Sequence, residues 1–418
     1  MNVLIGFFGL QTLSVILTLI RVISLQIMIS VLRFSYGAFL LFSGGVKIID
    51  PLGFSYKLQE YFEVFGMEWL VPMSLFLSVF VIVFEILLGV CLIFGVQVRK
   101  VMWGNLLLML FFTFLTFFSA YFNKVTDCGC FGDFMKLEPW HSFMKDIHLL
   151  FVSIILFIYQ KKIKSLFKET TSNQIYLFFI ATMVPVIFAV YTLSHLPVID
   201  FRAYHIGANL IEDRKTCDQI DKPCLQEEIW YKVVDKQLGD TLRMLSHEWA
   251  SKWREYDKVP GYDERVIIDK GYEPPIKDFD IIHPLTGTDF TDSFLQEFDR
   301  LLLVISYDIE KTNVEGYRKL ENSITLGNTS YSTSVGDIPV IGLSSSSKVE
   351  IEEKLSKVLL APFPYFLVDQ TTLKTIIRSN PGVVLLENGV VVNKWHWRDF
   401  PTFDDIIQDP SLHPDYVK

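Results

Sequence analysis

The chain has 418 residues, half of them hydrophobic, and a mean hydropathy of +0.34, which is more apolar than a typical soluble enzyme. The first 200 residues hold 13 Lys and Arg against 11 Asp and Glu, whereas the remaining 218 hold 25 against 36. This division predicts a membrane region followed by an acidic soluble region, and the acidic half argues against nucleic acid as a partner.

Five stretches in the first half are long and apolar enough to cross a bilayer, which takes about 20 residues. They are 25–46, 72–96, 101–122, 143–160 and 174–195. Residues 1–24 are also apolar, and this segment is an extra span, an interfacial helix or an extension of the next helix. The pattern predicts a four-helix transmembrane bundle over 25–165 and an additional span within 170–198.

Basic residues predict which loops face the cytoplasm, because cytoplasmic loops are enriched in Lys and Arg. Arg99 and Lys100 follow the second span, and four lysines follow the fourth at 161, 162, 164 and 168. The loops 47–71 and 123–142, and everything after about 196, then face the other side. In a bacterial inner membrane that side is the periplasm, where disulfides form.

The loop sequence TDCGCFGDF, residues 126–134, carries the most distinctive chemistry. A bond between Cys128 and Cys130 would close a small, strained ring that is easily reduced, and Gly129 and Gly132 supply the backbone freedom for tight turns. Asp127 and Asp133 would raise the pKa of nearby thiols unless a cation offsets them. Lys124 and Lys136 are candidate cations.

Redox exchange is the favoured interpretation of this pair, and two others remain. The pair could be a static local disulfide, or half of a metal site completed by His141. No second CxC or CxxC supplies further thiolates, so no metal is assigned. Cys91 lies within a span, where a thiol usually packs as a small hydrophobic group.

Three segments in order resemble the MauE/DoxX-like family of small four-helix inner-membrane proteins, over about residues 28–160. They are RFSYGAFLLFSGGVKIIDPLGFSYKLQEYF from Arg33, FEILLGVCLIFG from Phe84, and DCGCFGDF followed by PWHSFMKDI. The resemblance implies a role in disulfide formation or thiol maturation of periplasmic proteins. A membrane quinone is the electron acceptor suggested by analogy with vitamin K epoxide reductase-like bundles, although those carry a CxxC and this chain has none.

Two ionisable residues, Arg33 and Glu85, fall within apolar spans, where a lone charge is costly. They are expected either to pair near a redox or ligand pocket or to join helices without a further role. Lys145 and Asp146 are expected to be interfacial anchors.

A polar stretch follows the fifth span, and residues 199–270 are predicted to form a loop-rich linker or insert. It contains TCDQIDKPC, in which Cys217 and Cys224 would form a structural disulfide. Alternatively, this pair could relay disulfides to Cys128 and Cys130 through a mixed disulfide.

Residues 271–418 are predicted to form a soluble α/β domain. Strands are expected at 301–309 and 338–345, helices at 312–325, 348–359 and 371–378, and a final hairpin turning at Asn388-Gly389. This order, with SNPGVVLL placing Pro381 before a strand, resembles the thioredoxin-like fold of the TlpA/peroxiredoxin type. The resemblance implies a cis bond before Pro381. Where that family keeps its CxxC, this chain reads SYDIEKTN, residues 306–313, so the domain cannot itself perform thioredoxin chemistry.

These features predict a multi-pass inner-membrane redox protein that acts through Cys128 and Cys130, with membrane lipid around it and a periplasmic C-terminal domain. That domain would recruit periplasmic protein thiols or an envelope protein. The alternative is a non-catalytic membrane scaffold or assembly factor in which every disulfide is structural.

Overall fold

A computed structural model describes residues 2–122, 124–125, 129–135, 137–166, 171–269, 271–324, 334–335, 338–355 and 363–401. The chain forms two compact units. The first contains Met1–Leu193 and Ile229–Arg265, and the second contains Ser194–Glu228 and Val266–Lys418. Each unit is described separately below.

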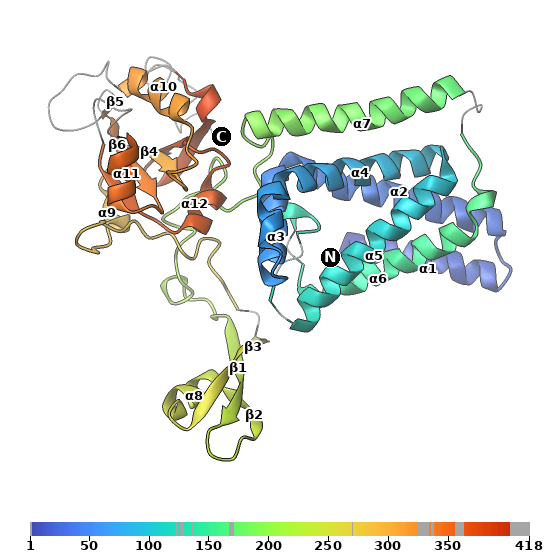
Figure 1. The fold of residues 1–418 in the computed structure, drawn as a ribbon, viewed down its shortest axis with the longest axis horizontal. Coiled ribbons are helices and arrows are strands. Elements are labelled where there is room, and N and C mark those ends of the chain that lie inside the picture. Colours follow the sequence, from blue (N-terminus) through green and yellow to red (C-terminus); the bar gives the residue numbers. More distant parts are fainter. Residues whose placement is uncertain are drawn as a thin grey trace. The chain divides into compact units, whose positions relative to one another are not determined.

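Helices dominate the first unit (Figure 1). They are α1 (Asn2–Leu19), α2 (Leu25–Ile49), α3 (Pro51–Val64), α4 (Ser74–Phe94), α5 (Val98–Phe122), α6 (Pro139–Ile158) and α7 (Thr171–Ser194), with short 3-10 turns at Glu68–Met73, Gly132–Phe134 and Gln160–Lys162. Within the described ranges, five helical segments are long and apolar enough to cross a membrane: Leu25–Ile49, Glu68–Phe94, Val98–Phe122, Pro139–Ile158 and Ser172–Ser194. The five predicted spans are therefore confirmed by length and composition, as in a multi-pass membrane protein.

The helix boundaries follow local sequence signals. Arg21 has a φ of 61° between α1 and α2, so the N-terminal apolar segment is a separate helix and not an extension of the next one. The Ser24 side chain caps α2, and the Asp50 side chain accepts a hydrogen bond from Gly53 N–H at the start of α3, where Pro51 occupies the first turn. Gly95, with a φ of 68°, ends α4 in the left-handed conformation.

Small residues allow α2 and α4 to pack closely. A Cβ added at Gly44 would lie 2.6 Å from Ile86 Cγ1, and one added at Gly37 would lie 2.5 Å from Ile93 Cγ1. Glycine removes the side chain that would separate the helices, which is how helices associate when lipid supplies no hydrophobic driving force. This close contact places residues of α2 directly opposite those of α4.

The second unit contains a sheet in the order β5-β6-β4-β8-β9, with β7 also paired to β6. The strands are β4 (Arg300–Ser306), β5 (Ser334–Val335), β6 (Ile338–Ser344), β7 (Tyr365–Leu367), β8 (Gly382–Glu387) and β9 (Val390–His396). Strand β6 runs parallel to β4 and to β7, whereas β5 is antiparallel to β6 and β8 is antiparallel to both β4 and β9. Asn388 and Gly389 both have positive φ in the β8–β9 turn, as the predicted hairpin requires.

Helices α9 (Thr291–Gln296), α10 (Val314–Ile324), α11 (Lys348–Leu355) and α12 (Gln370–Ile376) accompany this sheet. Two buried clusters pack on it, one around Leu303, Ile305 and Val384 and the other around Leu302, Val304 and Tyr317. Because successive β4 residues alternate between the clusters, both faces of the sheet are covered, and the strand reads as a continuous apolar run. The predicted strands and helices of this region are confirmed within their described residues.

The segment after α7 is part of the second unit. Gly207 N–H donates to Val391 O at 2.8 Å, and Leu210 N–H donates to Gly389 O at 2.9 Å, so residues 207–210 run along β9. Tyr204 and Leu210 are buried in the core. Whereas the sequence suggests a linker or insert throughout 199–270, its first part belongs to the folded domain.

The middle of that predicted insert forms a small separate sheet in the order β2-β1-β3, with one short helix. Its elements are β1 (Gln226–Asp235), β2 (Thr241–Leu245), α8 (Ser246–Lys252) and β3 (Tyr256–Asp269). Strands β1 and β2 are antiparallel, with Trp230 opposite Leu245 and Val234 opposite Thr241.

Candidate functional site: the Cys130 loop and the charges buried in the bundle

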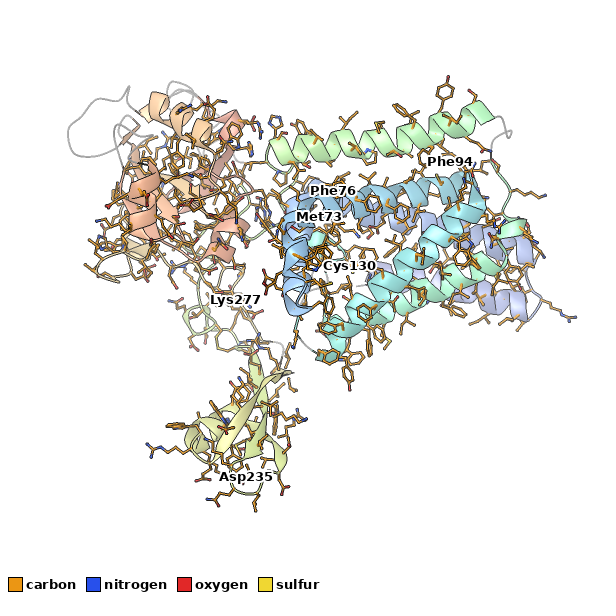
Figure 2. All side chains as sticks on the ribbon, in the orientation of Figure 1. Met73, Phe76, Phe94, Cys130, Asp235 and Lys277 are labelled. Carbon is orange, nitrogen blue, oxygen red and sulfur yellow. A yellow bond between two sulfur atoms is a disulfide. The ribbon has the colours of Figure 1, made fainter. Side chains whose placement is uncertain are left out.

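The loop between α5 and α6 is folded into the bundle around Cys130. Cys128 and Asp127 lie outside the described residues, so their predicted roles remain predictions. Cys130 is only 4% exposed, and its carbonyl accepts a hydrogen bond from the Ser43 hydroxyl of α2 at 3.2 Å. Figure 2 shows Cys130 at the end of the bundle where α4 begins near Met73, and Phe94 at the opposite end.

Two glycines shape this loop, as the sequence predicts. Gly129 and Gly132 have φ values of 65° and 51°, a region that residues with a Cβ rarely adopt. A Cβ at Gly129 would also lie 3.0 Å from Cγ of Lys57 on α3. Gly129 therefore lets the backbone of this motif approach the side-chain stem of Lys57, a residue that no local sequence pattern links to the loop.

Phe131 anchors the loop in the bundle core. Its ring is 1% exposed and lies 5.8 Å from the Phe39 ring of α2 and 5.9 Å from the Phe42 ring. Lys145 Nζ of α6 lies 5.4 Å from the centre of the same ring, within cation–π distance. The residue that follows Cys130 is thus an apolar anchor that also lies against a buried cationic side chain.

A buried ion pair crosses the bundle between α2 and α4. Lys47 Nζ lies 2.5 Å from Glu85 Oε2, and the two side chains are 1% and 3% exposed. The faces of Phe54 and Phe112 lie 5.4 and 4.9 Å from the same ammonium group. Burying a charged group at this depth costs free energy unless the group is paired. The pair therefore either holds α2 and α4 together or forms part of a functional site.

A second group of buried polar residues lies on α6 and its neighbours. Lys145 Nζ is 2.5 Å from Asp146 Oδ1, and both side chains are under 10% exposed. The charges of Glu85, Asp146 and Lys145 all act on the buried hydroxyl of Tyr36. The Tyr36 hydroxyl faces that of Ser153, and the side chains of Asn105 and Asp146 are buried in the same bundle.

The expected pairing of Arg33 with Glu85 is wrong. Arg33 instead donates hydrogen bonds to the carbonyls of Leu92 at 2.8 Å, Ile93 at 2.5 Å and Lys164 at 2.7 Å. The last turn of α4 leaves carbonyls without helical partners, and the guanidinium satisfies them. Arg33 therefore caps the C-terminal end of α4, whereas Glu85 forms its ion pair with Lys47.

The expectation that Lys145 and Asp146 are interfacial anchors is also wrong, because both are buried. Lys47 and Tyr36, like Lys145, were not selected as site residues. The sequence signal that could have found them is a polar side chain inside an apolar helix, on the helix face that also carries glycines. Lys124, one of the predicted cations, is exposed, and Lys136 lies outside the described residues.

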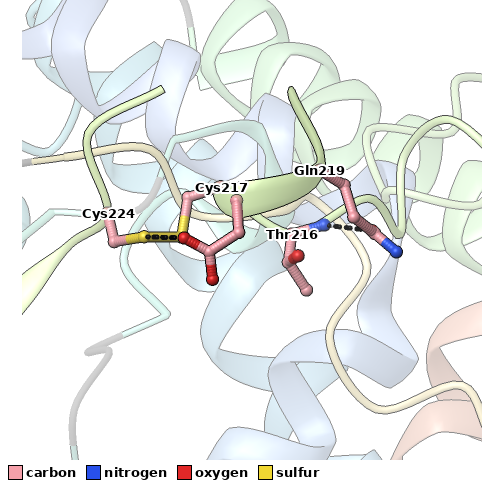
Figure 3. Close-up of a disulfide and its surroundings, with 5 residues drawn as sticks. Thr216, Cys217, Gln219 and Cys224 are labelled. Atoms are coloured by element: carbon pink, nitrogen blue, oxygen red, sulfur yellow. Dashed lines mark hydrogen bonds between the residues drawn. A yellow bond between two sulfur atoms is a disulfide. The ribbon is translucent and has the colours of Figure 1, made fainter. Parts of the chain in front are cut away.

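Cys217 and Cys224 form a disulfide in the second unit (Figure 3), with an S–S distance of 1.92 Å. Thr216 N–H donates to Gln219 Oε1 at 2.8 Å and closes the turn beside it. In the part of the chain that the structure describes, the single cluster with metal-binding geometry is Cys217, Asp218 and Cys224, whose two sulfurs are bonded to each other. His141, the other candidate ligand, lies 3.3 Å from Glu138 on the exposed surface.

The loop that follows β4 meets the residue before Pro381. The Asn380–Pro381 peptide bond is cis. Asn380 Nδ2 donates to Asp308 O at 2.7 Å, and Asn313 N–H donates to Asn380 O at 2.9 Å. The cysteine-free sequence SYDIEKTN thus lies against this proline.

Hydroxyl groups fill the interior beneath that loop. Ser306 bonds to Tyr317 at 2.5 Å, and Tyr317 bonds to Tyr365 at 2.7 Å. Burial raises the pKa of Tyr317 to about 12, so the chain of hydroxyls stays neutral. The interior at this position is a static hydrogen-bonded network without a thiol.

Two charged clusters fasten the start and the end of the second unit together. Asp200 contacts Arg202 Nε at 2.6 Å and Lys394 Nζ at 2.7 Å. Burial alone would raise the pKa of Asp200, but the two cations outweigh it and lower this pKa to about 2. His195 Nδ1 lies 2.7 Å from Asp399 Oδ1.

His396 is the buried titratable group next to these clusters. Its Nδ1 accepts a hydrogen bond from Arg398 N–H at 3.2 Å, which requires that nitrogen to be unprotonated. Burial, followed by repulsion from Arg398, lowers the pKa of His396 to about 4, although the Asp399 charge opposes the shift. His195 and Lys319 also face it and add repulsion.

No curated protein and no solved structure matches the chain. A protein-family model matches part of the helical region, and this part contains the three segments that resemble the MauE/DoxX-like family. Residues 25–159, from α2 to the end of α6, match the family described as methylamine utilisation protein MauE.

Proposed function

We propose that this protein is a membrane-bound thiol–disulfide redox protein in which Cys128 and Cys130 exchange disulfides with protein thiols. The observation that carries the proposal is the position of Cys130. It lies at one end of the bundle, held by Ser43 and Phe131, with the Lys57 stem against Gly129 and Lys145 over Phe131. Both lysines are paired with carboxylates, Lys57 with Glu60 and Lys145 with Asp146, so the loop is bordered by ion pairs, and exchange there would proceed through a thiolate.

In the proposed step, a thiolate of the partner attacks a sulfur of the Cys128–Cys130 disulfide. The S–S bond breaks, a mixed disulfide forms, and the released cysteine leaves as a thiolate. The second thiol of the partner loses its proton and attacks the mixed disulfide. The partner then holds a new disulfide, and Cys128 and Cys130 have gained two electrons.

Reoxidation of the pair needs an acceptor for these two electrons, and a membrane quinone is our proposed candidate. Two thiols would give two electrons and two protons to the quinone, which becomes a quinol while the disulfide re-forms. The support for this step is geometric: Lys145 lies over the Phe131 ring of the loop and is paired with Asp146, so buried ionisable side chains border the loop.

We further propose that the second unit is a thioredoxin-like docking module in the periplasm of a bacterium. Support comes from its strand order β6-β4-β8-β9, with β4 and β6 parallel and β8 and β9 antiparallel, and from the cis bond before Pro381. Residues 306–313 contain no cysteine, so the domain would bind a partner without oxidising it. The basic loops after α4 and α6 support a periplasmic position for this domain and for the Cys130 loop.

The test uses the full chain in phospholipid vesicles, with a reduced two-cysteine peptide as the probe thiol. Cys128→Ser/Cys130→Ser should abolish peptide oxidation, whereas Cys91→Ser removes a thiol within α4 and should leave the rate unchanged. If peptide oxidation persists in the double variant, the redox proposal is wrong. An inert Cys128–Cys130 bond in a mild glutathione buffer would instead favour the scaffold function, in which the disulfides are structural.

A further inference from the structure

A cavity of about 360 Å³ lies between α4, α5 and α7 in the first unit. Apolar side chains form most of its wall, among them Phe84, Leu87 and Leu88 of α4 and Phe178 of α7. Three polar side chains, Gln97, Lys100 and Gln174, lie at one end, and Gln97 Nε2 donates to Gln174 Oε1 at 3.3 Å. An apolar chamber with a polar mouth suits an amphipathic ligand.

The end of the bundle that holds this mouth is strongly basic. Leu166 N–H bonds to Phe94 O, Arg33 bonds to Leu92 O, and Gln97 bonds to Gln174, so four chain segments meet there. These segments, 21–33, 94–103, 158–166 and 171–180, contain six exposed Lys and Arg besides the buried Arg33, and no Asp or Glu. Such a surface attracts an anionic headgroup, and basic pockets between transmembrane helices bind anionic lipids in this way.

We propose that this cavity binds one acyl chain of an anionic phospholipid, with the lipid phosphate at Lys100. The three helices that form the cavity are all long and apolar enough to span a membrane, so its surroundings are lipid. Ile175 and Phe178 are 62% and 52% exposed, which leaves the α7 side open for a chain to enter from the bilayer. The apolar wall excludes free phosphate as the occupant, because a phosphate ion would not be stabilised there.

The cavity lies too far from the Cys130 loop to hold the electron acceptor of that loop. It contacts α5 at Val101, whereas the loop follows the other end of α5 at Phe122. A helix rises 1.5 Å per residue, so about 30 Å separates the two ends. Electron transfer from a cysteine thiol to a quinone ring requires contact between them. The lipid site is therefore independent of the proposed redox function.

Lipid selectivity provides the first test. We would titrate the purified full chain with phosphatidylglycerol and with phosphatidylcholine of the same acyl chains, and count bound lipid by native mass spectrometry. Lys100→Gln should weaken phosphatidylglycerol binding about fivefold and leave phosphatidylcholine binding unchanged. Arg99→Gln removes the same charge one residue away, outside the cavity wall, and should change binding by less than about twofold.

A second pair of variants tests the chamber itself. Ile175→Trp would fill the cavity and should remove at least about nine-tenths of the bound phosphatidylglycerol. Tyr176→Trp is the matched control, because Tyr176 is 64% exposed, much like Ile175, and does not contact the cavity. Thermal unfolding midpoints would verify that all four variants fold.

Three results would overturn the proposal. Equal losses in Lys100→Gln and Arg99→Gln would mean diffuse attraction of anionic lipid to the basic surface. Unchanged binding in Ile175→Trp would mean that lipid binds elsewhere. Equal affinity for the two lipids, or a quinone retained through purification regardless of Lys100, would mean that the occupant is neutral.

Discussion

The buried pair of Lys47 and Glu85 leads to a sharp prediction about stability. Glu85→Gln keeps the size of the side chain and removes its charge, which leaves the Lys47 ammonium 1% exposed without a counter-ion. Breaking a buried pair on one side costs about 3–5 kcal/mol. The Phe54 and Phe112 faces remain, but cation–π contacts offset only about 2 kcal/mol of this loss.

Replacing both partners should restore much of the lost stability. Lys47→Met/Glu85→Met removes both charges and keeps apolar volume, so we expect the double variant to lie within about 2 kcal/mol of the wild type. The cycle of wild type, Lys47→Met, Glu85→Met and the double variant should then give a coupling energy of at least about 4 kcal/mol, because each single variant leaves one charge unpaired and loses about 3–5 kcal/mol. Reversible unfolding of the full chain in detergent, followed by helical circular dichroism, measures all four corners of the cycle.

A surface pair on α3 serves as the control. Lys57 Nζ lies 3.0 Å from Glu60 Oε2, but the side chains are 29% and 38% exposed. Because water screens this pair, Glu60→Gln should cost less than about 1 kcal/mol. If Glu85→Gln costs no more than this control, or the cycle shows no coupling, the pair does not stabilise the bundle and the reasoning is refuted.

Three further predictions concern packing, pH and the disulfide. Gly44→Leu should destabilise the bundle by about 1–3 kcal/mol because α2 and α4 must separate, whereas Gly45→Leu, with open space around its Cβ, should change thermal stability by under about 0.5 kcal/mol. His396 has a pKa of about 4 when folded and 6.5 when unfolded, so the second unit should lose up to about 3 kcal/mol of unfolding free energy as the pH falls from 6.5 to 4, because the unfolded chain binds the proton first. Chemical denaturation at several pH values should show this dependence of the unfolding free energy on pH, and His396→Asn should reduce it. Cys217→Ser/Cys224→Ser should cost about 2 kcal/mol in the same assay, the amount expected for so short a loop, yet leave peptide oxidation intact if this disulfide is structural.

Much of the architecture could be predicted because it depends on local patterns. Hydropathy and length identified the five spans, and the apolar run at Leu301 to Ile305 identified the central strand of the sheet. Asn388-Gly389 identified the last hairpin, since both residues accept positive φ. Pro381 was singled out by its place before a predicted strand, and its peptide bond is cis.

Partners across the bundle could not be predicted in the same way. Arg33 and Glu85 both lie in apolar helices, but which residue each one meets depends on how the helices rotate about their axes. Small residues set that rotation through close backbone contact, as at Gly44, and the sequence does not state which face of α4 they meet. Glu85 therefore meets Lys47, and Arg33 meets helix-end carbonyls.

The domain boundary after α7 was missed for a similar reason. Residues 207–210 look like a polar loop because their partners lie about 180 positions later, at Gly389 and Val391. Long-range pairing of this kind leaves no local period in the sequence. The Cys-Gly-Cys motif was found because it is local, whereas Lys57 and Lys145 beside it come from separate helices.

The ion pairs just after α7 join the two ends of the second unit to each other. His195 contacts Asp399, and Asp200 contacts Lys394, so residues about 200 positions apart in the sequence are neighbours. A truncation before β9 would remove both partners at once and leave Asp200 and Arg202 without the buried cation Lys394. The last strand is therefore needed to hold the first residues of this unit in place, and the unit should tolerate extensions beyond residue 401 better than any cut before residue 390.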